Sequence, residues 1–578
     1  MARTHSFVNL PDVKRKRTKI RIPYGLKTTM SVGKLYPIDF MEVLPGDTIS
    51  GKVVNVSRVS SSFLRPVMDN LFCDIHHFFV PLRLVYEDAE KVFGNPNPSA
   101  YNSDTLKEIP SVYLSGDTDA YTVSEKSVGD YLGLPLGTYD NDQKVSVLPF
   151  RAFAKIWNEW FRNENVQGET YINMTDTPTS SEKVNNNNWS ASNYMGKLPS
   201  ANKIKDIFTS CLPKPQKGLA SEVPVSLKGK TPVFATGDIM SDETVEAYSG
   251  LAGMRMHSKS GLDVVNSTTV LNSVLGFPSD ITSNMSKNFT LGGQDIVFPE
   301  DQTFTSLYPS NLWALWDNPV ATANGNITVN DLRFAFQFQR MLEADALYGS
   351  RYSEYLLGHY GVSNPDSRLQ FTEYLGGGRI PISVQQVAQT VPISEESNVG
   401  ELGAFSLSNG FSRFSKSFTE HGYLFTVACI RQVHSYSQGL EKKWTRFDRN
   451  DFFDPLYAHL SEQPIYEEQL YHGSEAFKSK VFGYNEYGAE YRYIANRLTG
   501  EMRPQAANSQ DIWHFGDNFA SAPTLSDSFV KETPANVDRT LAVPSTSEDS
   551  FLCDFYFDLQ KISVMPLYST PGLVDHRG

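Results

Sequence analysis

A segment near the C-terminus, residues 551–560 (FLCDFYFDLQ), alternates apolar and polar side chains with a period of two. Its odd-numbered positions are apolar, and most of its even-numbered positions, including Asp554 and Asp558, are polar. Such alternation is typical of a β-strand that buries one face and exposes the other. Residues 48–59 (TISGKVVNVSRV) are another candidate strand, near the opposite end of the chain. Because strand signals stand at both ends, we expect one β-sandwich whose strands come from distant parts of the sequence.

Two denser apolar segments predict strands that are covered on both faces. They are residues 71–80 (LFCDIHHFFV) and 422–430 (GYLFTVACI). Helical periodicity is scarcer. It predicts helices over residues 149–165, from about Asp331 to Leu347, and around residues 352–357.

Two stretches are polar and weakly periodic. Residues 165–203 and 218–329 are rich in Ser, Thr and Asn. A structureless connection as long as the second stretch is unusual inside a compact domain. We therefore interpret it as a surface insertion that has its own short strands.

The charge of the chain is unevenly distributed. Residues 1–35 hold nine basic residues and one acidic residue, whereas the whole chain carries a net charge of −13. Six cations cluster near the start of the chain: Lys14, Arg15, Lys16, Arg17, Lys19 and Arg21. Cations at this density bind a phosphate backbone by releasing its counterions. We predict that residues 1–35 form a basic N-terminal arm that contacts nucleic acid, with a solvated flexible tail as the alternative.

The sequence contains none of the motifs that mark common catalytic sites. There is no GxSxG, no HExxH and no complete EF-hand loop. Residues 229–231 (GKT) resemble the end of a phosphate-binding loop, but Pro232 blocks the helix that should follow. The glycine run 376–378 predicts a tight turn rather than a nucleotide site. We therefore expect neither an enzymatic activity nor a cofactor.

Histidine and cysteine positions do not indicate a metal centre. His76 and His77 are adjacent on a predicted strand, so their imidazoles point to opposite faces and cannot both bind one ion. Asp74 shares a face with His76 and makes at most half a site, so packed or interface histidines are the preferred interpretation. The cysteines lie more than 100 residues apart and predict small buried side chains in a reducing compartment: Cys73, Cys211, Cys429 and Cys553.

No segment is apolar enough to span a membrane. The longest apolar stretch, residues 423–430, is far shorter than the roughly 18 residues that a span needs. The basic N-terminus is not followed by the apolar segment of a signal peptide. We expect a protein that is not inserted in a membrane and is not exported by the usual route.

Ten collinear segments resemble the major capsid proteins of the Microviridae, most closely those of the gokushovirus branch. The segments that carry the resemblance are 25–52 (GLKTTMSVGKLYPIDFMEVLPGDTISGK), 65–94 (RPVMDNLFCDIHHFFVPLRLVYEDAEKVFG), 148–167, 206–218, 332–362, 368–378 (RLQFTEYLGGG), 417–425 (SFTEHGYLF), 482–500, 537–539 and 565–576 (MPLYSTPGLVDH). The match covers most of the chain outside about 219–329. The chain is therefore identified as a member of this family.

The resemblance implies an eight-stranded viral jelly roll, in which two antiparallel sheets pack together and carry long loop insertions and a few helices. It also implies a small icosahedral (T=1) shell that encloses circular single-stranded DNA of a bacteriophage. We expect residues 36–578 to form a single jelly-roll domain from both chain ends. Residues 219–329 are expected to be a variable surface insertion that protrudes at the threefold axes and contributes to host attachment.

The partners implied by the resemblance are further copies of the chain, the packaged single-stranded DNA and a host surface receptor. They also include an internal scaffolding protein, a small DNA-binding protein and a DNA pilot protein of the same virus. The expected location is the virion, assembled in the bacterial host cytoplasm. Relatives have a sparser basic stretch before the segment that matches Lys27-Thr28-Thr29. The basic arm thus either supplements the small DNA-binding protein or contacts neighbouring subunits.

Two other interpretations remain. A β-sandwich that binds a carbohydrate or a receptor without forming a shell would explain the Asn/Ser-rich loops and the aromatic residues, but not the basic arm. A hydrolase on a β scaffold is the second, and no motif supports it.

Overall fold

The computed structural model describes residues 17–93, 107–114, 121–137, 143–178, 182, 188–218, 329–349, 351–362, 371–388, 402–457, 462–473 and 480–568, together with the backbone of six short strands between residues 233 and 314. The chain divides into two compact units. The first consists of residues 1–218 and 342–578, and the second of residues 219–341.

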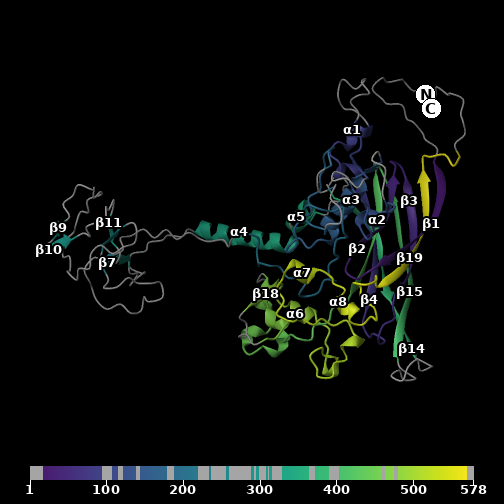
Figure 1. The fold of residues 1–578 in the computed structure, drawn as a ribbon. Helices are drawn as coiled ribbons and strands as arrows, with labels where there is room; N and C mark the ends of the chain where they lie inside the picture. The colour runs from purple at the N-terminus through teal and green to yellow at the C-terminus, as the bar shows by residue number, and fades with distance from the viewer. Residues whose placement is uncertain are drawn as a thin grey trace, which may run out of the picture. The chain divides into compact units, whose positions relative to one another are not determined.

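Two antiparallel sheets dominate the first unit (Figure 1). One sheet has five strands in the order β1-β19-β3-β15-β14. Their bounds are β1 Thr18–Met30, β3 Thr48–Val59, β14 Val384–Ala388, β15 Leu402–Ser417 and β19 Phe551–Ser563. The other sheet has four strands in the order β13-β4-β16-β2. Their bounds are β2 Leu35–Val43, β4 Leu71–Pro81, β13 Glu373–Ile382 and β16 Gly422–Gln432.

The first and the last strand of the described chain lie side by side. β1 pairs with β19 without a break in register, from Thr18 opposite Ser563 to Met30 opposite Phe551. Residues 18–30 of the segment predicted as a basic arm therefore form a strand of the sheet, whereas residues 1–16 of that segment lie outside the described residues. The physical reason for the strand is that its even-numbered side chains are apolar or aromatic from position 20 to 26 and pack toward the core.

The core lies between the two sheets and follows from the alternation along each strand. In β19 the odd-numbered side chains from Phe551 to Leu559 are buried. Ile49 and Val53 of β3 and Cys73 and Ile75 of β4 belong to the same cluster. Each fully buried side chain of this size stabilises the fold by about 1.5–3 kcal/mol relative to an exposed one.

The four-stranded sheet is also covered on its second face. Helix α3, Leu148–Ile156, packs against β4 and β16, and the short helix α2, Val128–Tyr131, packs against β2 (Figure 1). β4 and β16 are accordingly buried along almost their whole length. The five-stranded sheet instead alternates between buried and exposed side chains.

Long connections join β4 to β13 and β16 to β19. The residues that follow β16 form a second, smaller apolar cluster with residues 207–211, which includes Phe208, Leu470, Phe482 and Phe529. The other helices are α1 Ala89–Phe93, α4 Val329–Tyr348, α5 Tyr352–Tyr360, α6 Ala489–Arg492, α7 Asp527–Val530 and α8 Ala535–Asp538. The other strands of the first unit are β5 Ser111–Tyr113, β6 Lys144–Ser146, β17 Gln463–Tyr466 and β18 Val481–Asn485. Single turns of 3-10 helix are Leu82–Leu84, Lys442–Trp444, Arg449–Asp451, Pro455–Tyr457, Glu467–Gln469, Gly500–Met502 and Asp511–Trp513.

In the part of the second unit that the structure describes, six short strands pair two by two. β9 pairs with β10, β8 with β11, and β7 with β12, all antiparallel. Their bounds are β7 Val233–Ala235, β8 Met256–Ser258, β9 Asn288–Leu291, β10 Gln294–Val297, β11 Leu307–Pro309 and β12 Leu312–Ala314.

Most of the elements expected from periodicity are present. The chain is mainly β with antiparallel sheets and few helices, and the strand predicted at 48–59 has these same bounds. The helix expected over 149–165 is shorter, because α3 ends at Ile156 and continues only as a π-helical turn, Trp157–Phe161. All four cysteines are free and buried, as their apolar surroundings predicted.

Candidate functional site

The six cations predicted to bind nucleic acid are divided by the structure. Arg17, Lys19 and Arg21 lie within the described residues, whereas Lys14, Arg15 and Lys16 lie outside them. Arg17 comes directly before β1, and Lys19 and Arg21 belong to that strand. All three are exposed.

The alternation of β1 places its cations on the outer face of the five-stranded sheet. Lys19 and Arg21 point away from the core, whereas the intervening Ile20 is partly buried and Ile22 packs against the core. Lys27 lies further along the same outer face. The strand therefore presents a row of positive charge to the outside along the edge of the sheet.

Two of these cations face acidic side chains of the neighbouring strand β19. The Arg21 guanidinium donates to both carboxylate oxygens of Asp558, with Nε to Oδ1 at 2.7 Å and Nη2 to Oδ2 at 3.0 Å. The hydrogen bond from Arg21 holds the pKa of Asp558 below its ordinary value. Lys27 Nζ lies 3.6 Å from Asp554 Oδ2. Exposed pairs of this kind contribute little to stability, so a polyanion competes for these cations at small cost.

His76 and His77 point to opposite faces of β4, as alternation predicted. His77 lies between the sheets, with Nδ1 3.0 Å from Thr426 Oγ1 and Nε2 2.8 Å from Ser412 Oγ. His76 lies on the other face, where its Nδ1 is 3.3 Å from the Tyr374 hydroxyl. Burial lowers the pKa of His76 to about 4 and that of His77 to about 3, so both imidazoles are neutral near pH 7. His76 therefore contacts the neighbouring strand β13, and His77 contacts β16 in its own sheet and β15 in the opposite sheet.

Asp74, on the same face as His76, is held by two arginines. Arg379 donates to both of its carboxylate oxygens, at 2.7 and 3.1 Å, and Arg431 donates from Nε at 3.0 Å and from Nη2. Burial alone would raise the pKa of Asp74, but the hydrogen bonds and charges of Arg379 and Arg431 lower it below its ordinary value. This carboxylate therefore joins β13 and β16 to β4 and is not available to a metal ion.

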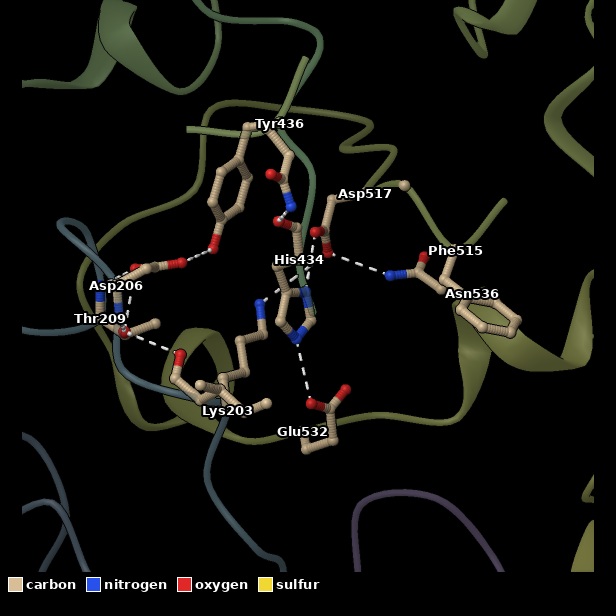
Figure 2. A network of polar contacts seen from close by, with 12 residues as sticks. Lys203, Asp206, Thr209, His434, Tyr436, Phe515, Asp517, Glu532 and Asn536 are labelled. Atoms are coloured by element: carbon tan, nitrogen blue, oxygen red, sulfur yellow. Dashed lines mark hydrogen bonds and ion pairs between the residues drawn. The ribbon is translucent and has the colours of Figure 1, made fainter. Parts of the chain in front are cut away.

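A buried polar network lies just beyond the end of β16 (Figure 2). It consists of Lys203, Asp206, His434, Tyr436, Asp517 and Glu532. The imidazole of His434 is at its centre, with Nδ1 2.8 Å from Asp517 Oδ2 and Nε2 3.0 Å from Glu532 Oε2. Both ring nitrogens face carboxylates, an arrangement that suits the doubly protonated imidazolium.

The charges of the network determine how its members ionise. Burial lowers the pKa of His434, but the charge of Glu532 and the hydrogen bond to Asp517 outweigh burial and raise it to about 9. Burial raises the pKa of Asp517, but the hydrogen bond and charge of His434 and the charge of Lys203 outweigh burial and hold this pKa below its ordinary value. Lys203 Nζ lies 4.0 Å from Asp517 Oδ1. The network therefore joins three distant segments of the chain through buried ion pairs.

No sequence motif predicts this network. The members of the network are isolated in the sequence. Asp517 lies 83 residues after His434, and Glu532 lies 98 residues after it. The only local signal is a histidine two residues after the end of an apolar strand, β16. Sequence reasoning missed the network because its members are brought together only by the return of the chain after β16.

Among the residues that the structure describes, no group of three or more His, Cys, Asp or Glu side chains is arranged to hold a metal ion. The helices in the same part of the chain are all too short or too polar to cross a membrane.

Comparison with known proteins gives a consistent result. A protein-family model described as capsid protein (F protein) matches residues 8–573. Three proteins, each named capsid protein VP1, are similar over nearly their whole length. That of Spiroplasma virus 4 is 35% identical, with 99% of this chain and 98% of the relative covered. That of Chlamydia phage 1 is 34% identical (98% and 97%), and that of Bdellovibrio phage phiMH2K is 33% identical (98% and 97%).

Proposed function

This chain belongs to the capsid protein (F protein) family, and on that premise we propose that its copies build a small icosahedral (T=1) shell around circular single-stranded DNA of a bacteriophage. It is a major capsid protein of the Microviridae type and a component of the virion. A protein of this kind functions by self-association of identical copies.

The order in which the strands pair is the observation that carries the proposal. Taken along the chain, the strands pair from the ends inwards: β1 with β19, β2 with β16, β3 with β15, and β4 with β13. β13 continues after Ser383 into β14, which joins the other sheet. Counting this bent strand once gives eight extended segments. Nested pairing of eight segments in two sheets is what a jelly roll has, and it supports an eight-stranded viral jelly roll here.

Exposed apolar side chains support contacts between copies. Trp444, Phe447 and Leu456 lie in one connection between strands, and the side chain of Leu456 is 84% exposed. Several large apolar side chains exposed in one connection are candidates for a protein interface. We propose that they are covered by a neighbouring copy in the shell.

We further propose that the basic segment contacts the packaged DNA. The residues are Lys14, Arg15, Lys16, Arg17, Lys19 and Arg21. The exposure of Arg17, Lys19 and Arg21 supports this role, since phosphate contacts need cations that water also reaches. A role in contacts between subunits is the alternative.

The remaining partners follow from the family resemblance. We propose that residues 219–329 protrude from the shell and contribute to attachment to a host receptor, a role that suits a block of sequence lying wholly within a separate compact unit. The same resemblance supports an internal scaffolding protein, a small DNA-binding protein and a DNA pilot protein as partners, and assembly in the bacterial cytoplasm. Residues 36–218 and 330–578 would then form the wall of the shell.

A structural role accounts for the polar groups that an enzyme would use. His77, Asp74 and His434 each have their polar atoms occupied by neighbouring side chains. We therefore propose that the chain has no catalytic activity and needs no cofactor.

The shell is tested by sedimentation of the protein from infected cells, followed by nuclease treatment of the fractions. We expect megadalton particles that carry nuclease-resistant single-stranded DNA. A slowly sedimenting species without nucleic acid would contradict the shell and favour the carbohydrate-binding alternative.

The basic segment is tested by charge removal rather than by deletion, because β1 begins at Thr18. Replacing Lys14, Arg15, Lys16 and Arg17 by Gln should weaken binding of single-stranded DNA and lower the slope of log affinity against log salt by about three. An unchanged slope would assign the segment to subunit contacts.

A further inference from the structure

The outer face of the five-stranded sheet combines aromatic and basic side chains. Tyr556 of β19 and Phe411 of β15 lie in the same row, each opposite Val54 of β3. Their side chains remain 46% and 53% exposed. Two strand spacings separate them, which is about 10 Å.

Phe411 is flanked by two cations on this face. Lys52 Nζ lies 4.9 Å from the centroid of its ring, and the Arg413 guanidinium carbon lies 4.7 Å from it. Lys52 and Arg413 are themselves opposite each other in the register of β3 and β15. Cation–π contacts of this kind hold long side chains in place, which reduces the entropy lost when they bind a ligand.

Positive charge predominates over the whole face. The cations at its outward positions are Lys52 and Arg58 of β3, Arg413 of β15, and Lys19, Arg21 and Lys27 of β1. The two carboxylates among these rows, Asp554 and Asp558, belong to β19. A net positive face is unusual on a chain of net charge −13, so it identifies an anionic partner.

Further cations precede this sheet in the sequence. Arg17 comes directly before β1, the edge strand of this sheet, and the sixteen residues before it include Lys14, Arg15 and Lys16. The basic segment thus enters the fold at the border of the same face. On the opposite side of the sandwich, helices cover the four-stranded sheet (Figure 1).

We propose that this face is a binding site for single-stranded DNA, in which bases stack on Tyr556 and Phe411 while Lys52, Arg58 and Arg413 bind phosphates. Exposed aromatic rings interleaved with cations are what proteins use to bind single strands without sequence preference. A duplex hides its bases and offers only phosphates, so the site prefers single strands. This inference rests on the proposed function, because it gives the packaged DNA a second contact beyond the basic segment.

The test measures binding of a labelled oligothymidine to the unassembled full-length chain over a range of salt concentrations. The double variant Lys52→Gln/Arg413→Gln removes two phosphate contacts and should lower the log–log salt slope by roughly 1.4, with about tenfold weaker binding at low salt. Tyr556→Ser removes one stacked base and should weaken binding about tenfold without changing the salt slope.

The matched control is Arg449→Gln/Arg492→Gln, which removes the same charge from exposed arginines on a connection outside the sheet. It should leave both affinity and slope close to those of the natural chain. Thermal melting of each variant checks that it is folded. A duplex of the same length is expected to bind more weakly than the single strand.

Three results would overturn the proposal. One is equal binding by the sheet variants and the control, and another is equal affinity for duplex and single strand. The third is a change in sedimentation of the sheet variants without a change in DNA binding, which would make the face a contact between copies. None of these three results contradicts the proposed function. That function is tested separately by nuclease-resistant DNA in particles from infected cells.

Discussion

The two sheets of the sandwich differ in how they use their outer faces. β16 of the four-stranded sheet is buried at ten of its eleven positions, whereas β19 of the five-stranded sheet alternates buried and exposed side chains along most of its length. One sheet is therefore an internal wall between the core and the helices. The other covers the core on one face only and leaves its second face exposed.

The two sheets also differ in the burial of their Arg–Asp pairs. Asp74 of β4 is 2% exposed and accepts from two arginines, whereas Asp558 of β19 pairs with the exposed Arg21. Removing one member of a buried pair leaves an uncompensated charge, whereas water replaces a missing partner at the surface. The comparison teaches that similar Arg–Asp pairs serve stability in one sheet and remain exchangeable in the other.

The largest expected effect comes from substituting these two carboxylates. Asp74→Ala should lower the free energy of unfolding by about 3–5 kcal/mol, because Arg431 would stay largely buried without its partner. Asp558→Ala should have no measurable effect on unfolding. Urea unfolding of the unassembled chain measures both, and equal effects would remove the contrast between the sheets.

The next effect is a pH dependence caused by His434, which follows β16. Its pKa in the folded chain, about 9, lies above the ordinary value, so its stabilisation is complete below about pH 6.5 and is lost as pH rises through 9. We expect the free energy of unfolding to fall by roughly 3 kcal/mol over this range. His434→Gln should flatten the profile, and a slope that persists in this variant would assign it to other groups.

His77 provides the matched control with the opposite sign. Its folded pKa, about 3, lies below the ordinary value, so its contribution is complete above about pH 6.5 and is lost as pH falls toward 3. His77→Gln should therefore leave the alkaline limb of the stability profile unchanged.

The smallest expected effect is on the outer face of the five-stranded sheet. Phe411→Ala should change the free energy of unfolding by no more than about 0.5 kcal/mol, because its ring is half exposed. The same truncation at Phe425, fully buried in β16, should cost about 3–5 kcal/mol. A large loss of stability at Phe411 would show that the ring supports the fold rather than a partner.

Local periodicity was sufficient where a strand or helix buries one regular face. Residues 48–59 and 551–560 were predictable because alternation depends only on which side chains avoid water, and β3 and β19 follow it. β1 has the same alternation from Ile20 to Leu26, but the dense cations before and within it favoured the interpretation of an arm. Its identity as a strand depends on pairing with residues more than 500 positions away.

The sequence by itself determined the class of the fold, the uneven charge and, through collinear resemblance, the capsid family. It also determined that His76 and His77 face opposite ways, since that follows from strand geometry alone. Only the tertiary structure decided which face of each sheet is covered and which distant groups meet, such as His434 with Asp517 and Glu532. The physical reason is that exposure and ionisation depend on neighbours in space, and the long connections between paired strands separate those neighbours widely in sequence.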